Sequence, residues 1–182
     1  SVSDTASFTI ADNGNPSFIT APQDKTVECD GTGNTVDFNA WIASGGDAVS
    51  TDSCSSTSYS STGATQPSTN CGTGSTVTNT FTLSDECGNS ITATASFTIQ
   101  DTIDPVFDVN PADMSVECTD SNASQFTAWL GNDGGAEGSD VCGGGSFANS
   151  GGSIPTDKCG GSTVVTFTLT DTCGNSASRT AA

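Results

Sequence analysis

The sequence predicts an all-β protein made of two similar domains, and three observations support this fold class. Short runs of Thr, Val, Ile and Phe are separated by Gly, Asn and Asp, which is typical of strands joined by turns. The chain also repeats itself, with matched cysteines 86 to 89 residues apart. Each repeat contains four of the eight cysteines, and such small domains outside the cell are commonly held together by disulfides.

The composition narrows the classes of function. The 182 residues include 21 acidic and three basic side chains and no His, and the formal net charge is −18. Nucleic acid is a poor partner for this chain, because phosphate binding needs Lys and Arg. Without His there is no Ser–His or Cys–His pair, and we expect no enzyme. No apolar run is long enough to span a membrane, so we expect no membrane insertion.

The two repeats align segment by segment. The paired segments are TVECD (26–30) with SVECTD (115–120), FNAWIASGGDA (38–48) with FTAWLGNDGGA (126–136), and NCGTGSTVTNTFTLSDECGNS (70–90) with KCGGSTVVTFTLTDTCGNS (158–176). The boundary falls at QDTIDP, where Pro105 matches Pro16. We therefore expect an N-terminal strand over 1–12, a first domain over 13–101 and a second domain over 102–182.

Strands are predicted where apolar and polar residues alternate. In SITATASFTI (90–99) the inward positions are Ile91, Ala93, Ala95, Phe97 and Ile99. TVTNTFTL (76–83) alternates in the same way, and Gly88-Asn89 suits a tight hairpin turn between the two strands.

Each repeat also contains a short segment with helical spacing. Phe38, Trp41 and Ile42 lie at i, i+3 and i+4 before a pair of glycines. Their counterparts are Phe126, Trp129 and Leu130. We expect one short helix with a glycine stop in each repeat and both Trp side chains in the core. The alternative is a strand with one outward Trp.

In this order, the motifs VEC, F-x-A-W-[IL], D-x-C and T-F-T-L-[ST]-D-x-CGNS resemble the four-cysteine hyalin-repeat-like (HYR-like) domain of bacterial surface proteins. The resemblance implies two tandem immunoglobulin-like β-sandwich domains, each with two disulfides. It implies adhesins or surface filaments, an extracellular or cell-surface location, and no enzymatic activity.

In such a sandwich, Cys54 and Cys87 lie on segments that run to one pole of the domain, and Cys29 and Cys71 run to the other. We therefore expect the pairs Cys29–Cys71, Cys54–Cys87, Cys118–Cys159 and Cys142–Cys173. A zinc site is the weaker interpretation, because the chain has no His and no close-paired cysteines.

The last strand of the second repeat is shorter than its counterpart. Aligned on Cys87 and Cys173, the positions of Ile91, Ala93 and Ala95 correspond to Ala177, Arg179 and Ala181, but Phe97 and Ile99 have no counterparts. The hexapeptide TASFTI within the long strand, at 94–99, also occurs at 5–10.

We therefore expect Ala6, Phe8 and Ile10 of one copy to complete the second domain of another copy, against Ala177, Arg179 and Ala181. This mode of strand addition joins copies of the chain head to tail into a filament. The alternative is a two-repeat segment of a very large covalent adhesin, in which the next strand follows residue 182.

Acidic residues are expected to gather where one repeat meets the next. The candidate ligands for a structural calcium ion are Asp101, Asp104, Asp140 and Asp171 at the second repeat, and Asp12, Asp52 and Asp85 at the first. The alternative is a solvated acidic rim near turns, where Asp is common anyway. No other cofactor is expected.

A carbohydrate-binding module is the main rival from another class of function. It needs exposed aromatic side chains, and the candidates are Trp41, Trp129, Tyr59 and Phe147. Asn122 begins the sequon NAS and is a candidate for glycosylation. The sequence does not indicate which surface or carbohydrate ligand a filament would contact.

Overall fold

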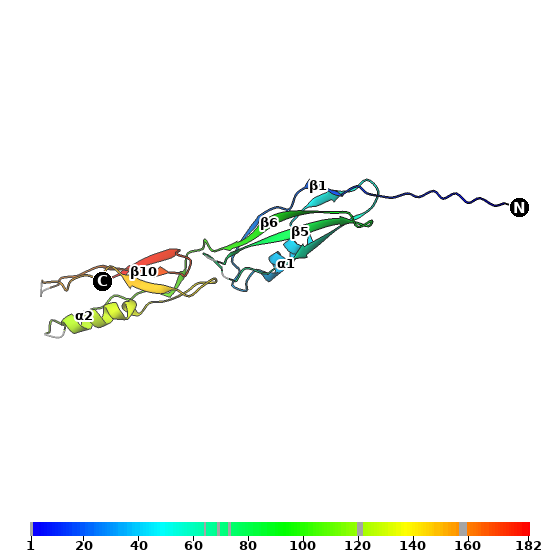
Figure 1. Ribbon diagram of the computed structural model, residues 1–182. Coiled ribbons are helices and arrows are strands. Elements are labelled where there is room, and N and C mark those ends of the chain that lie inside the picture. The colour runs from blue at the N-terminus through cyan, green and yellow to red at the C-terminus, as the bar shows by residue number, and fades with distance from the viewer. Residues whose placement is uncertain (1, 64, 69, 73, 120–121, 157–159) are drawn as a thin grey trace. The chain divides into compact units, whose positions relative to one another are not determined.

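The computed structural model covers residues 1–182 and describes all of them except 1, 64, 69, 73, 120–121 and 157–159. The described part is mostly β, with several small sheets and two short α-helices (Figure 1). It divides into two compact units. Unit 1 consists of Ser1–Val27, Asn34–Ser68 and Ser75–Thr98, and unit 2 of Glu28–Gly33, Thr69–Gly74 and Ile99–Ala182. Unit 2 therefore contains two short pieces of the first repeat.

The main sheet of the first repeat has the strand order β2-β6-β5-β4, and β1 pairs with β3 in a separate ladder. The strands are β1 (Ser17–Thr20), β2 (Lys25–Glu28), β3 (Val49–Thr51), β4 (Thr57–Thr62), β5 (Thr76–Asp85) and β6 (Ser90–Gln100). The predicted hairpin is confirmed, because β5 and β6 pair antiparallel down to Ser84 opposite Ser90. Gly88 in the connecting turn has φ 94°, which glycine adopts without steric cost.

The core of unit 1 forms between this sheet and helix α1 (Thr35–Ala43). Phe38 and Trp41 are the buried side chains of the helix, and Trp41 is fully inaccessible to solvent. The Trp41 ring meets Phe81 and Phe97, with centroids 5.1 and 5.4 Å apart. The predicted helix and the predicted burial of Trp41 are therefore confirmed. The alternative prediction, a strand with an outward-facing Trp, is wrong for this repeat.

Unit 2 contains smaller sheets and a second helix. Its elements are β7 (Val106–Val109), α2 (Asn122–Gly131), the 3₁₀ turn η1 (Asp133–Gly135), β8 (Glu137–Ser139), β9 (Ser146–Asn149), β10 (Val165–Thr170) and β11 (Ser176–Ala181). β7 pairs with β8, and the other strands have the order β11-β10-β9. Val165, Phe167 and Ala181 are buried together under α2. The helical spacing of the second repeat is thus confirmed as well.

The disulfides differ from the expected pairing. Cys29 is bonded to Cys142 and Cys71 to Cys173, with Cα atoms 5.9 and 5.7 Å apart, so each bond joins the first repeat to the second. The expected pairs Cys29–Cys71 and Cys142–Cys173 are therefore wrong. The expected pairs were assigned within each repeat, from which cysteines run to the same pole of one domain. In the structure, Cys29 and Cys71 of the first repeat are instead bonded to cysteines of the second repeat.

The described part of the chain contains two disulfides instead of the predicted four. Cys54 and Cys87 are exposed and not bonded to each other, contrary to expectation. Cys118 is also exposed and outside any disulfide, and its expected partner Cys159 lies outside the described residues. Two disulfides indicate an oxidising, extracellular type of environment.

The β-rich class is confirmed, and the immunoglobulin-like sandwich stays a prediction. Neither helix in the described residues combines the length and apolar character that crossing a membrane requires.

Candidate functional site

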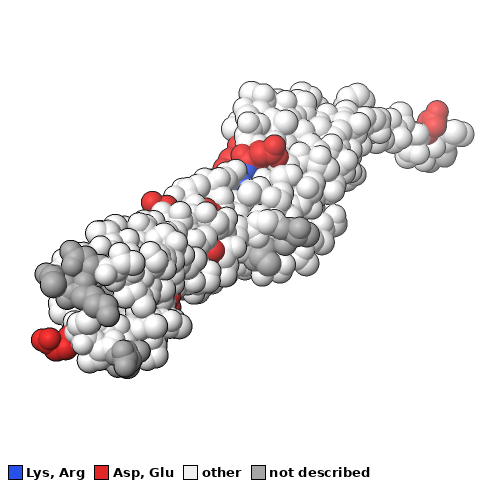
Figure 2. Space-filling model, turned by 90° about the vertical axis from the view of Figure 1, so that its left-hand side faces the viewer, with Lys and Arg blue, Asp and Glu red and all other residues white. Residues whose placement is uncertain are grey.

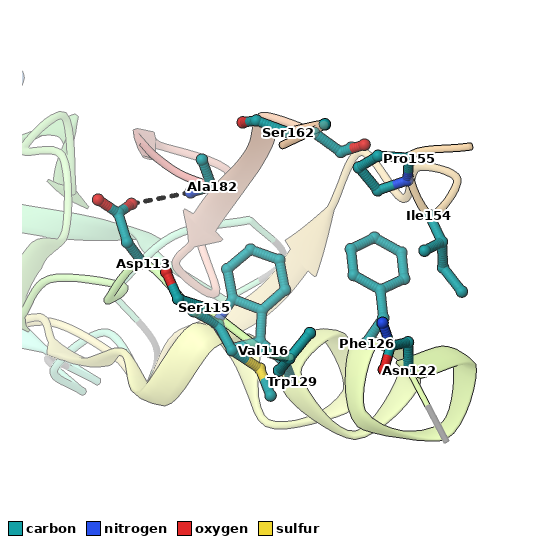
Figure 3. A pocket seen from close by; sticks show the side chains of 13 residues that line it. Asp113, Ser115, Val116, Asn122, Phe126, Trp129, Ile154, Pro155, Ser162 and Ala182 are labelled. Atoms are coloured by element: carbon teal, nitrogen blue, oxygen red, sulfur yellow. Dashed lines mark hydrogen bonds between the residues drawn. The ribbon is translucent and has the colours of Figure 1, made fainter. Parts of the chain in front are cut away.

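A groove of about 380 Å³ opens on unit 2 beside helix α2. One wall is formed by residues 113–116, and the opposite part by Gly161, Ser162 and Thr163. Figure 3 shows Phe126 and Trp129 projecting from α2 into this groove. Ala182, directly after β11, lies at the groove, and its amide donates to the carboxylate of Asp113 at 2.8 Å.

The groove lies where β6 continues in the first repeat. There the second half of β6 lies between β2 and the start of β5, with Phe97 opposite Val77 and Thr98 opposite Thr76. In the second repeat β11 has six residues where β6 has 11, and β10 has six where β5 has 10. Residues 114–117, the counterpart of β2, belong to no strand. The groove is therefore bounded by the segments that would flank a strand, and no described strand lies between them.

The burial of the two helices differs accordingly. Phe38 and Trp41 are buried in α1, whereas no side chain of α2 is buried. In unit 1 the ring of Phe97 packs against Phe38 at a centroid distance of 5.3 Å. No described side chain of unit 2 takes the place of Phe97 over α2. Because Phe126 and Trp129 lack this cover, they line the groove.

The predicted acceptor residues lie on β11, an edge strand. Ala177, Arg179 and Ala181 are opposite Leu169, Phe167 and Val165 of β10. Ala181 is buried, whereas Arg179 is exposed and places its guanidinium 5.4 Å from the centre of the Phe107 ring. Arg179 thus contacts an aromatic face at the surface, which stabilises the charge without placing it in the core.

The predicted donor segment is exposed. Residues 2–12 belong to no described helix or strand, and Figure 1 shows them as an extended trace outside the sheets of unit 1. The side chain of Phe8 is 90% exposed and that of Ile10 is 86% exposed, and Ala6 is also exposed. An exposed apolar segment with strand alternation is available for pairing with another surface.

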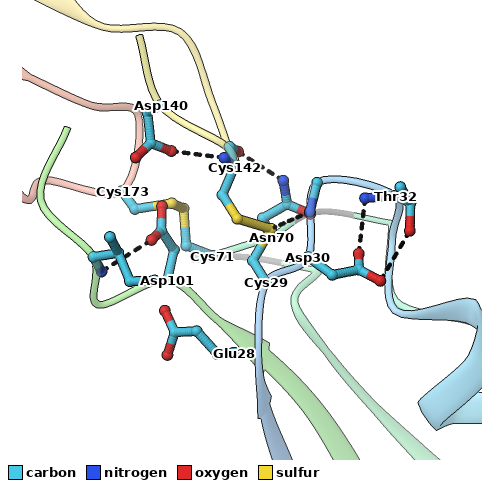
Figure 4. Close-up of a disulfide and its surroundings, with 12 residues drawn as sticks. Glu28, Cys29, Asp30, Thr32, Asn70, Cys71, Asp101, Asp140, Cys142 and Cys173 are labelled. Atoms are coloured by element: carbon cyan, nitrogen blue, oxygen red, sulfur yellow. Dashed lines mark hydrogen bonds between the residues drawn. A yellow bond between two sulfur atoms is a disulfide. The ribbon is translucent and has the colours of Figure 1, made fainter. Parts of the chain in front are cut away.

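The structure brings most of the predicted calcium ligands into two groups. In unit 1, carboxylate oxygens of Asp12, Asp52 and Asp85 lie within 4.8 Å of one another. In unit 2, an oxygen of Asp101 lies within 4.8 Å of one from Asp140, and likewise of one from Asp171 (Figure 4 shows Asp101 and Asp140). Nearby Cys142 and Cys173 are in disulfides and offer no thiolate.

Asp104 is outside these groups, and its carboxylate accepts the amide of Ser176 at 3.2 Å. On the face drawn in Figure 2, the acidic side chains form small separate groups on a largely neutral surface. The acidic residues are therefore concentrated at a few places, which include the two carboxylate groups described above.

Asp171 organises the turn between β10 and β11. Its Oδ1 accepts the amides of Cys173, Gly174 and Asn175 at 2.6–2.9 Å, and its Oδ2 accepts the side-chain amide of Asn175 at 2.8 Å. Burial raises the pKa of Asp171, but these hydrogen bonds outweigh it and hold the pKa below its ordinary value. Asp85 and Asn89 repeat the arrangement in unit 1, where the pKa of Asp85 is also lowered.

Asp101 has the opposite character. Its side chain is 8% exposed, and its Oδ2 is buried with no hydrogen-bond partner among the described residues. Burial, followed by the charges of Asp140 and Asp171, raises the pKa of Asp101 despite a hydrogen bond from the Ile103 amide. Asp12 occupies the matching position in the first repeat, and its Oδ2 is likewise buried without a described partner. An unpartnered carboxylate oxygen beside two other carboxylates suits a hard cation such as calcium.

The remaining candidates are placed as follows. The side-chain oxygen of Asn122 accepts the amide and hydroxyl of Thr119 at 3.0 and 2.8 Å, at the start of α2, and its glycosylation stays a prediction. Trp41 is unavailable to a sugar because it is buried, and the Tyr59 hydroxyl donates to the Ala48 carbonyl at 3.1 Å. Phe147 packs against Phe107, with ring centroids 5.7 Å apart.

Sequence reasoning missed the bonds between repeats, Cys29–Cys142 and Cys71–Cys173. The tandem repeat is the signal that could have indicated them, because consecutive repeats bring cysteines of one repeat close to cysteines of the next.

No protein-family model matches this chain, and a comparison with curated proteins finds no match. The resemblance to HYR-like domains therefore stays an expectation based on the motifs.

Proposed function

We propose that this protein is a structural subunit of an extracellular filament of immunoglobulin-like domains. Each copy donates the segment that contains Ala6, Phe8 and Ile10 to the groove of unit 2 in the next copy. The contact is head to tail and does not close on itself, so it builds an open filament. The alternative is a two-repeat part of a long covalent adhesin, in which the same groove is filled by the continuing chain.

The observation that supports this proposal is the match between groove and segment. The groove is bounded by the counterparts of the segments that hold residues 96–99 of β6 in the first repeat. Residues 5–10 have the same sequence as residues 94–99. The amide of Ser96 donates to Asp24 at 2.7 Å, and the amide of its counterpart Ala182 donates to Asp113 at 2.8 Å. The open positions of the second repeat therefore begin at the counterpart of Phe97, which Phe8 matches.

The energetics favour insertion. Phe8 and Ile10 would move from almost full exposure to the places that Phe97 and Ile99 hold, where the exposed fractions are 0% and 1%. Burial of each side chain contributes about 1.5–3 kcal/mol. The backbone of the inserted segment would also pair with the walls of the groove, as in other cases of strand addition.

The test is assembly of the purified 182-residue chain, followed by size-exclusion chromatography and electron microscopy. The double variant Phe8→Asp/Ile10→Asp should remain monomeric, because two charges would enter an apolar groove. Val2→Asp is the matched control, since Val2 is fully exposed in the same segment but outside the hexapeptide. Filaments of the double variant that equal those of the control would overturn strand donation.

A second measurement separates the subunit from the covalent array. Native material denatured in SDS with reductant should give a band near 18.1 kDa if copies are separate chains. A single very large chain would instead support the adhesin array.

We also propose that calcium binds at Asp101, Asp140 and Asp171, and at Asp12, Asp52 and Asp85. The supporting observation is that Asp101 and Asp12 each have a buried carboxylate oxygen with no hydrogen-bond partner among the described residues. The ion would act structurally, by neutralising the carboxylates of each group.

A further inference from the structure

The two disulfides follow one rule of the repeat. Each bond connects a cysteine of the first repeat to a cysteine of the second, Cys29 to Cys142 and Cys71 to Cys173, and all four lie in unit 2 (Figure 4). The matched cysteines of the two repeats are Cys29 with Cys118, Cys54 with Cys142, Cys71 with Cys159, and Cys87 with Cys173. The Cys29–Cys142 bond therefore joins the first cysteine of one repeat to the second cysteine of the following repeat.

If every first cysteine pairs with the second cysteine of the following repeat, one cysteine in each repeat of this chain is left without such a partner in the same chain. Cys118 is the first cysteine of the second repeat, and Cys54 is the second cysteine of the first repeat. Both are exposed and outside any disulfide. If a further copy of the first repeat followed the second repeat, Cys118 would face the Cys54 of that copy.

Cys54 is presented in the same way as the bonded Cys142. The amide of Cys54 donates to Asp52 Oδ2 at 2.8 Å, and the amide of Cys142 donates to Asp140 Oδ1 at 2.6 Å. Asp52 belongs to the carboxylate group of Asp12, as Asp140 belongs to that of Asp101. The turn that carries Cys54 therefore shares this amide hydrogen bond and a neighbouring carboxylate group with the turn that carries the bonded Cys142.

Cys118 is located where a donated strand would lead. It lines a second hollow together with Val116 and Asn122, and both of these residues also line the groove. In the first repeat, the equivalent Cys29 is tied to the end of β6, because its amide donates to the Gln100 carbonyl at 2.7 Å. A donated segment continues after Ile10 to Asp12, as β6 continues after Ile99 to Asp101.

We propose that Cys118 of one copy forms a disulfide with Cys54 of the copy whose N-terminal strand occupies its groove. This inference rests on the proposed strand donation and adds a covalent link to it. The filament would then be held at every junction by a buried strand and by a bond equivalent to Cys29–Cys142.

The bond forms by oxidation of two thiols. A small-molecule disulfide of the oxidised-glutathione type supplies the oxidant: the thiolate of Cys118 displaces one small thiol and forms a mixed disulfide. The thiolate of Cys54 then attacks the Cys118 sulfur and displaces the second small thiol. Two protein thiols are oxidised and the small disulfide is reduced to two thiols, which take up the two protons.

The proposal is confined to Cys118 and Cys54, because Cys159, the sequence counterpart of Cys71, lies outside the described residues. Any bond made by Cys87 could keep copies linked on a gel, so the test must identify the bonded pair itself.

The experiment assembles an equal mixture of ¹⁵N-labelled and unlabelled chains with oxidised glutathione, and then blocks remaining thiols with iodoacetamide. Digestion before Asp residues suits this chain, which has 21 acidic and three basic residues. We expect a reducible peptide pair containing Cys54 and Cys118, including mixed light–heavy pairs that arise only between copies. Phe8→Asp/Ile10→Asp at equal concentration should lack it, which excludes random collision.

Cys118→Ser should lose this peptide pair but still form filaments, because the strand contact does not need the bond. Filaments of the wild-type chain in which Cys54 and Cys118 are both alkylated, or in which Cys118 is bonded within its own chain, would overturn the disulfide alone. Failure of the wild-type chain to assemble at all would instead overturn strand donation, and with it the link between copies.

Discussion

The indole nitrogen of Trp129 donates to the carbonyl oxygen of Ala112 at 3.0 Å. Trp41 makes the equivalent bond to Gln23 at the same distance, so both rings are anchored alike. Trp41 is nevertheless fully buried, whereas Trp129 is partly exposed at the groove. The difference between these two side chains reports directly on whether a strand covers the helix.

Fluorescence quenching should therefore detect the occupied groove. In the monomeric Phe8→Asp/Ile10→Asp background, we expect acrylamide to quench Trp129 while Trp41 stays protected, and a Trp129→Phe variant assigns the two signals. A synthetic peptide of residues 5–12 should shield Trp129. The same peptide with Asp in place of Phe8 and Ile10 is the control. Equal protection of both Trp residues without peptide would show that the groove is closed.

Replacing Asn79 by Val should stabilise unit 1. Asn79 is 2% exposed on β5, and neither polar atom of its amide has a hydrogen-bond partner among the described residues. Its counterpart in the second repeat is the fully buried Val165. Because an unpaired buried amide is costly, Asn79→Val should raise the free energy of unfolding by about 1–3 kcal/mol.

Urea unfolding of unit 1 measures this change. The reciprocal variant Val165→Asn should destabilise unit 2 by a comparable amount. A loss of stability in Asn79→Val would mean that the Asn79 amide makes an interaction that stabilises the fold.

Asp101→Asn should make stability less sensitive to calcium. The pKa of Asp101 is raised in the folded state, so its contribution to stability is present below the unfolded pKa and is lost as pH rises through the folded pKa. At pH 7 without calcium, the uncharged Asn should therefore raise Tm relative to the wild type. With calcium the wild type should gain stability, because the ion neutralises Asp101, and the variant should gain less.

Thermal unfolding in calcium and in chelator gives both comparisons. Asp104→Asn is the matched control, because Asp104 is outside the carboxylate groups. An identical calcium response in Asp101→Asn and the wild type would rule out an ion held by Asp101.

Asp171→Asn should have the opposite pH dependence. The lowered pKa of Asp171 means that its charged form stabilises the fold above the unfolded pKa, and that this contribution is lost as pH falls through the folded pKa. The variant should therefore have a lower Tm than the wild type at pH 7, and the difference should shrink on acidification. Asp108→Asn, at an exposed position, is the control. A Tm difference that does not change with pH would contradict the role of the carboxylate charge.

The regular elements were predictable because their signals are local. The alternation of residues 90–99 is enough to define β6, and the spacing of Phe38 and Trp41 is enough to define α1. The grouping of Asp12, Asp52 and Asp85 also followed from the order of turns along the repeat.

Features that depend on a partner were harder to predict. SVEC at 115–118 resembles TVEC at 26–29, yet β2 is a strand and residues 115–118 are in none. A strand needs a paired neighbour, and the described part of the second repeat has no counterpart of residues 97–100 of β6 to supply it. The disulfides depend in the same way on contacts between repeats, which an argument about one repeat omits.

The Cys29–Cys142 bond has a consequence for a filament under load. It closes a sequence separation of 113 residues, and this loop contains α1, β5 and β6. Tension that enters at residues 5–10 and leaves through β11 passes from the backbone at Cys29 through the sulfur–sulfur bond to Cys142. The covalent path of this tension therefore bypasses the enclosed loop. While this bond is closed, unfolding of α1 or β5 would therefore add no length to the covalent path between Cys29 and Cys142, and these elements could refold between pulls.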